Sequence, residues 1–200
     1  MNIINKFGFI LILLIFLGCK REVQLPYYTI NNDFLQYVYF KKGSYWIYKN
    51  ENNELLDSCT LIYPPNVTPV KPEGLGYNYE EITTFFISKF LSYSKISAQP
   101  YYDVSLFEEI GGYSPISIRT SMAVGQKYTY NESVIEQIAS YDSIMINDSI
   151  FKNVIQTRVA LNDSILYSYF FAKNIGLIKF EKRYLNTDTT WSLLRWHTIQ

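Results

Sequence analysis

Two cysteines and one histidine are the residues best suited to covalent or metal chemistry in this chain of 200 residues. Cys19 follows an apolar run, Cys59 lies within the apolar stretch LLDSCTLIY, and His197 stands close to the C-terminus. One histidine and one further thiol cannot complete the tetrahedral ligand set of a zinc site. A nucleophilic cysteine needs a base beside it, and no local signature joins Cys59 to His197. We therefore expect Cys59 to be a buried, apolar-type residue and His197 to be structural.

Carboxylates offer the other route to catalysis. Glu108 and Glu109, beside Gly111 and Gly112, form the best local pair for hydrolysis by two carboxylates, but we expect them at a solvated strand end. The NDS clusters at Asn147 and Asn162 lack the spaced oxygen ligands of a calcium loop and indicate turns. The sequence contains no nucleophile elbow, P-loop or dinucleotide fingerprint. It predicts no catalytic site, no metal site and no cofactor, and a protein that is not an enzyme.

The N-terminus has the layout of a secretory signal. In MNIINKFGFILILLIFLG, one positive charge at Lys6 precedes an apolar core of 11 residues from Phe7 to Leu17. A membrane-spanning helix needs about 20 apolar residues. This core is therefore too short to remain as a span.

The triplet Leu17-Gly18-Cys19 resembles the lipobox of bacterial lipoproteins. The resemblance implies cleavage between Gly18 and Cys19 and attachment of diacylglycerol to the Cys19 thiol. Two or three acyl chains hold a protein on a bilayer where one chain is marginal. In such lipoproteins an Asp after the cysteine marks retention in the inner membrane. Lys20 stands there instead, which favours the outer membrane, on either its periplasmic or its surface face.

Three segments follow from this interpretation: a signal peptide over 1–18, a lipidated cysteine with a tether over 19–26, and one domain over 27–200. The mature chain has 200 − 18 = 182 residues, with 18 − 1 = 17 Lys plus Arg against 18 Asp plus Glu, a balance of −1. This balance gives no basic surface for nucleic acid.

Residue types along the chain favour β structure. NNDFLQYVYF predicts a short helix capped by Asn31 or Asn32, and SYWIYKN with LLDSCTLIY predicts a hairpin. The Pro- and Gly-rich segment 64–79 predicts a long loop. EITTFFISKFLSYS and YYDVSLFEE are strand candidates, whereas ESVIEQIAS is the strongest alternative for a helix, with Val134, Ile135 and Ile138 on one face.

The C-terminal part gives the clearest fold signal. Five β-type runs, YDSIMI, IFKNVIQTRVAL, ILYSYFFA, LIKFEKRY and TTWSLLRWHTI, are separated by short Asn-, Asp- or Gly-containing turns. In the last run, alternation puts His197 on the same face as Trp191, Leu193 and Ile199. The sequence predicts a mainly β fold: a single antiparallel curved sheet, half-barrel or sandwich, with a C-terminal meander of about five strands.

Two stretches, GSYWIY and YFFAKNIGLIKFE, resemble a pattern of β-rich envelope lipoproteins. Some of those are similar to curved-sheet carriers that shield lipid tails, such as the lipoprotein-sorting carriers. We expect a lipid-anchored interaction module of the cell envelope that binds a protein, a polysaccharide or a lipid. The alternative is a carrier that holds a lipid or another hydrophobic ligand in the concavity of the sheet.

Overall fold

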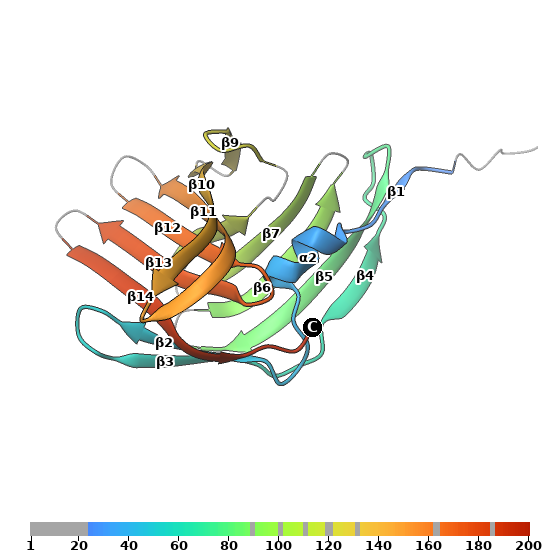
Figure 1. Ribbon diagram of the computed structural model, residues 1–200. Coiled ribbons are helices and arrows are strands. Elements are labelled where there is room, and N and C mark those ends of the chain that lie inside the picture. The colour runs from blue at the N-terminus through green and yellow to red at the C-terminus, as the bar shows by residue number, and fades with distance from the viewer. Residues whose placement is uncertain are drawn as a thin grey trace, which may run out of the picture.

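The structure is a computed structural model. It describes residues 24–88, 91–99, 102–109, 112–118, 122–130, 133–161, 165–184 and 187–200. Figure 1 shows a strongly curved sheet with one short helix on its concave side.

Within the described residues, fourteen strands make up this sheet, and its main path runs β8-β7-β6-β5-β3-β2-β14-β13-β12-β11-β10-β9. The strands are β1 Tyr27–Tyr28, β2 Tyr45–Asn50, β3 Leu56–Leu61, β4 Asn66–Val70, β5 Asn78–Ile87, β6 Leu91–Gln99, β7 Tyr102–Glu109, β8 Gly112–Ile118, β9 Lys127–Tyr130, β10 Ser133–Ile146, β11 Ser149–Leu161, β12 Ile165–Ala172, β13 Gly176–Tyr184 and β14 Thr187–His197. The pairs along the path are antiparallel, whereas the two residues of β1 pair with β5 in parallel. The sheet stays open, which confirms the prediction of a mainly β, curved sheet.

The predicted C-terminal meander is confirmed by strands β10 to β14, each of which pairs with the next. Its turns use left-handed backbone where the sequence supplies suitable residues. Asn147 and Asp148 have φ values of 47° and 60° between β10 and β11, and Asn174 has a φ of 65° between β12 and β13. Asn and Asp tolerate this region better than most residues do.

The predicted helix is also confirmed. Helix α2 spans Asn32–Val38, and the Asn31 side chain caps it by accepting a hydrogen bond from the backbone N–H of Asp33. Phe34 and Val38, one turn apart, are fully buried on the concave side of the sheet.

The prediction for residues 64–79 is partly wrong. β2 and β3 form the expected hairpin, but the segment that follows contains a strand, β4, which pairs with β5. β4 has β5 as its only partner among the described strands, so it lies at an edge. An edge strand accepts Pro69, because the missing N–H is not needed on the open side. The loop is therefore shorter and runs from 71 to 77.

The helix alternative for ESVIEQIAS is wrong. These residues belong to β10, where Ser133, Ile135 and Gln137 are buried and Val134 between them is exposed. A β-bulge between Gln137 and Ala139 interrupts the alternation and gives the run a spacing that imitates a helix.

The hairpin of β10 and β11 is longer than its neighbours and folds back across the sheet. β12 pairs with β11 only from Val154 onward, and the turn reaches β14, where Asn147 Nδ2 donates to the carbonyl oxygen of Leu193 at 3.1 Å. The Phe151 ring packs against Trp196 with centroids 5.2 Å apart. The β10–β11 hairpin therefore packs against β14, the last strand of the meander.

Candidate functional site

The predicted lipidation and cleavage residues, Gly18 and Cys19, lie outside the described residues. No helix within the described ranges is long and apolar enough to cross a membrane. The first described residues are already attached to the sheet, because the Pro26 carbonyl oxygen accepts a hydrogen bond from the Asn78 N–H at 2.8 Å.

Cys59 has the surroundings of a packing residue. It lies in β3 with 1% of its surface exposed and forms no disulfide. Burial raises the pKa of the Cys59 thiol far above its usual range, because the thiolate would lose its hydration. The side chain therefore stays a neutral thiol, and a neutral thiol is a poor nucleophile.

His197 lies on the opposite face of the sheet from Cys59. It is exposed and stands beside the Tyr45 ring at 5.9 Å between centroids. Its backbone partner is Tyr45, whereas Cys59 pairs with Trp46, the next residue of β2. Successive residues of a strand point to opposite faces, so the thiol and the imidazole cannot form a catalytic pair here.

The predicted shared face of His197 and Leu193 is wrong. A β-bulge between Leu193 and Arg195 inserts one residue into β14, so Leu193 stands opposite Tyr48 while His197 stands opposite Tyr45. Leu193 is buried and His197 is exposed as a result.

Carboxylates give no metal site in the part of the chain that is described. Glu108 and Glu109 end β7, and their side chains lie outside the described part. Across the described ranges, no group of three or more His, Cys, Asp or Glu side chains could hold a metal ion. Asn147 lies in a hairpin turn, as its NDS cluster predicts, and Asn162 falls outside the described residues.

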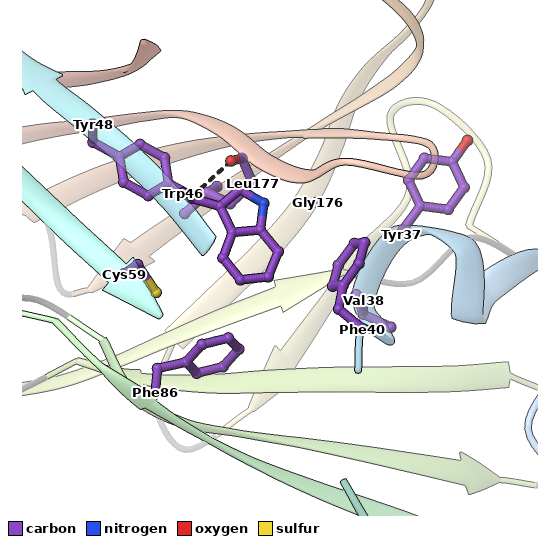
Figure 2. A pocket seen from close by; sticks show the side chains of 9 residues that line it. All are labelled: Tyr37, Val38, Phe40, Trp46, Tyr48, Cys59, Phe86, Gly176 and Leu177. Atoms are coloured by element: carbon purple, nitrogen blue, oxygen red, sulfur yellow. Dashed lines mark hydrogen bonds between the residues drawn. The ribbon is translucent and has the colours of Figure 1, made fainter. Parts of the chain in front are cut away.

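A small apolar pocket lies where α2 meets the turn between β12 and β13 (Figure 2). Its lining comes from α2, β2, β3, β5, β13 and the segment after the helix: Tyr37, Val38, Phe40, Trp46, Tyr48, Cys59, Phe86, Gly176 and Leu177. We call the contact of Phe40, Trp46, Tyr48, Gly176 and Leu177 the junction.

Two aromatic side chains of β2 hold the junction by hydrogen bonds. Trp46 Nε1 donates to the carbonyl oxygen of Ile175 at 2.6 Å, and the Tyr48 hydroxyl donates to that of Leu177 at 2.8 Å. Figure 2 draws the second of these bonds. Burial raises the pKa of Tyr48 well above its usual value, so the hydroxyl remains a donor.

Gly176 lets the turn approach these rings. Its φ is +92°, and a Cβ built on it would lie 3.0 Å from Cε2 of Phe40. A side chain at this position would meet both backbone strain and a collision. The Asn174 N–H donates to the Gln36 carbonyl oxygen at 2.7 Å, which ties the same turn to α2.

The junction therefore brings together the stretches GSYWIY and YFFAKNIGLIKFE. Alternation in GSYWIY indicates that Trp46 and Tyr48 share a face, but no local signal indicates that their partners lie 129 residues further along the chain.

The pocket itself is too small for a hydrophobic ligand. Its volume is about 20 Å³, enough for about one water, whereas pockets for small-molecule ligands have volumes of about 300 Å³ or more. Helix α2 and the aromatic rings occupy this part of the concave side.

Sequence reasoning missed an exposed apolar surface where the chain enters the domain. Leu25, Tyr27 and Leu75 are 40%, 48% and 44% exposed. Leu25 and Tyr27 flank the bond from Pro26 to Asn78, and Leu75 lies on the adjoining loop 71–77. We call these three residues the root surface. Leu25 and Tyr27 could have been singled out because they follow Cys19 closely in the sequence. Nothing in the sequence indicates that the loop containing Leu75 adjoins them.

Comparisons with known proteins find one weak structural likeness. No protein-family model matches the chain, and no curated protein matches it. One solved structure is similar: the crystal structure of a "putative lipoprotein" from Parabacteroides distasonis, with a TM-score of 0.46 and 12% identity. The match covers 78% of this chain and 96% of that one.

Proposed function

We propose that this protein is a lipid-anchored module of the bacterial cell envelope that binds a protein or a polysaccharide partner and carries out no catalysis. The observation that supports the anchor is the order of residues in FILILLIFLGCK: a short apolar core, then Gly18 and Cys19, then charge at Lys20. Lys20 in place of an acidic residue supports the outer membrane as the location.

Binding through the surface is favoured over carriage of a lipid. The pocket on the concave side holds about 20 Å³, and α2 covers the sheet beside it with the buried Phe34 and Val38. An acyl chain would have to displace these side chains from the core. The carrier alternative therefore draws no support from the described part of the concavity.

Replacement of the lipidated cysteine tests the anchor. We expect Cys19→Ala to abolish incorporation of labelled fatty acid and to leave the protein as unprocessed precursor or as soluble material. Cys59→Ala is the matched control, because it removes the other cysteine and leaves the signal intact. Labelling of Cys19→Ala at the level of the unchanged protein would overturn the anchor.

Native mass spectrometry of the protein, released from detergent, separates the two binding modes. An interaction module shows the mass of the lipidated chain alone. A reproducible additional mass that leaves on denaturation and is identified as a lipid would establish the carrier instead.

A further inference from the structure

We propose that the root surface, Leu25, Tyr27 and Leu75, rests in the headgroup layer of the membrane that carries the Cys19 lipid, and so orients the domain on it. This inference rests on the proposed lipid anchor. It adds that the domain meets the bilayer with a defined face.

Covalent geometry keeps the root surface close to the bilayer. Six residue steps separate Cys19 from Leu25, which limits their Cα distance to roughly 20 Å even in a fully extended chain. The acyl chains hold Cys19 at the boundary of the hydrocarbon layer. Leu25 therefore cannot lie more than roughly 20 Å from that boundary, whatever the conformation of the intervening residues.

The chemistry of the root surface suits that layer. Single exposed apolar residues are normal on proteins, so exposure alone carries no weight. Here Leu25 and Tyr27 flank Pro26, whose carbonyl oxygen is bonded to Asn78, and Leu75 lies three residues before Asn78. Tyrosine is enriched at membrane interfaces because its ring is apolar and its hydroxyl remains hydrated.

The shape of the adjoining loop leaves this surface uncovered. A Cβ built on Gly74 or Gly76, on either side of Leu75, would meet no other atom within 4 Å. The loop is nevertheless anchored, because the Tyr77 ring packs edge-on against Tyr28 at 5.6 Å between centroids. The loop therefore presents Leu75 outward from a fixed base.

Charge does not oppose the contact. The exposed charges of the loop, Lys71 and Glu73, cancel. The residues next to the anchor carry one net positive charge, from Lys20, Arg21 and Glu22. Positive charge close to the membrane is attracted to anionic lipids. The surface is therefore compatible with a bilayer of phosphatidylethanolamine and phosphatidylglycerol.

An orientation follows from the fold. Figure 1 places β1 and the turn between β2 and β3 at opposite ends of the molecule. With the root surface on the bilayer, that turn, residues 51–55, points away from the membrane. A partner in the envelope would meet this far end first.

Fluorescence quenching on the lipidated full chain tests the contact. Glu73→Cys places a polarity-sensitive label on the loop, and Leu55→Cys places the same label at the far end, where the side chain is 55% exposed. Both proteins are reconstituted into vesicles of phosphatidylethanolamine and phosphatidylglycerol that contain a nitroxide-labelled lipid. We expect quenching several-fold stronger at position 73 than at position 55.

A matched pair of double variants separates contact from mere proximity. In the Glu73→Cys background, Leu25→Ser with Leu75→Ser should reduce the quenching several-fold, whereas Leu55→Ser with Leu56→Ser should leave it unchanged. Equal quenching at positions 73 and 55, or quenching that survives Leu25→Ser with Leu75→Ser, would overturn the proposal. Failure of the anchor is distinguishable, because the intact mass would then lack the acyl chains.

Discussion

The junction and the root surface both contain large apolar side chains, but they use them in different ways. At the junction, Trp46 and Tyr48 are 3% and 1% exposed and donate to main-chain carbonyl groups. At the root surface, Tyr27 and Leu75 leave nearly half of their surface in water. A chain with 19 tyrosines thus divides this residue type between holding the fold and facing outward. Composition alone cannot separate these uses, because the division depends on contacts between distant segments.

Thiol reactivity should give the largest difference between the two regions. Cys59 lines the pocket at the junction, and burial raises its pKa, so alkylation requires opening of the core. With a typical free energy of unfolding, we expect Cys59 to react about a thousandfold or more slowly than a free thiol. The thiol in Glu73→Cys should react at the free rate. Mass-spectrometric timing of iodoacetamide labelling measures both, and rapid labelling of Cys59 in the native protein would contradict the burial.

Replacement of Gly176 should give the largest loss of stability. Gly176→Ala combines positive φ with a close contact to Phe40, and we expect a loss of about 3 kcal/mol in the free energy of unfolding. Gly125→Ala is the matched control, because Gly125 also has a positive φ, +85°, but a Cβ there would meet nothing within 4 Å. Its loss should be about 1 kcal/mol. Denaturant titration gives both values, and equal losses would show that the contact with Phe40 is unimportant.

Removal of single hydroxyl groups should give a smaller difference. Tyr48→Phe deletes a buried donor and leaves the Leu177 carbonyl without this bond, so we expect a loss of about 1.5 kcal/mol. Tyr27→Phe, at the root surface, should change stability by less than about 0.5 kcal/mol. A negligible effect of Tyr48→Phe on the denaturation midpoint would argue against the hydrogen bond at the junction.

A surface ion pair outside both regions should have the smallest effect. The hydrogen bond from Arg158, at 2.7 Å across β10 and β11, is the main cause that lowers the pKa of Glu136, with a further contribution from Lys127. A lowered pKa in the folded state contributes stability above the usual carboxyl pKa of 4.5, and this stability is lost as the pH falls through the folded value. Because Arg158 is partly exposed, we expect this ion pair to contribute about 0.5 kcal/mol to the free energy of unfolding.

Glu136→Gln should remove this part of the pH dependence. The variant should be less stable than the unchanged protein at pH 7, and the two should converge as the pH falls through the lowered pKa of Glu136. Denaturant titrations across that range measure the difference. A difference that is independent of pH would show that the charge on Glu136 does not act through Arg158.

Local signals predicted much of the fold. Asn31 caps α2, and turns that contain Asn, Asp or Gly join the strands from β10 to β14. Both features depend only on residues close together in the sequence, so the sequence shows them directly. Two of the three errors lie where an irregularity breaks the repeat. The bulge after Gln137 gives β10 a spacing that resembles a helix. The bulge after Leu193 places His197 on the other face of β14.

The candidate sites were less accessible to sequence reasoning. The inertness of Cys59 followed from its apolar neighbours, and the structure agrees with that expectation. The junction depends on bonds across 129 residues, and the root surface depends on the pairing of β1 with β5. Neither contact has a signature in adjacent residues, so both became visible only in the folded chain.

Hydrogen exchange on the lipidated protein in vesicles, compared with the soluble material that Cys19→Ala leaves, tests most directly whether the domain rests on the bilayer. We expect slower exchange on vesicles in residues 24–30 and 71–79, with no change in residues 172–178 at the junction. Identical exchange of residues 24–30 and 71–79 in the two forms would contradict contact with the bilayer, since the domain would then be tethered only by its lipid.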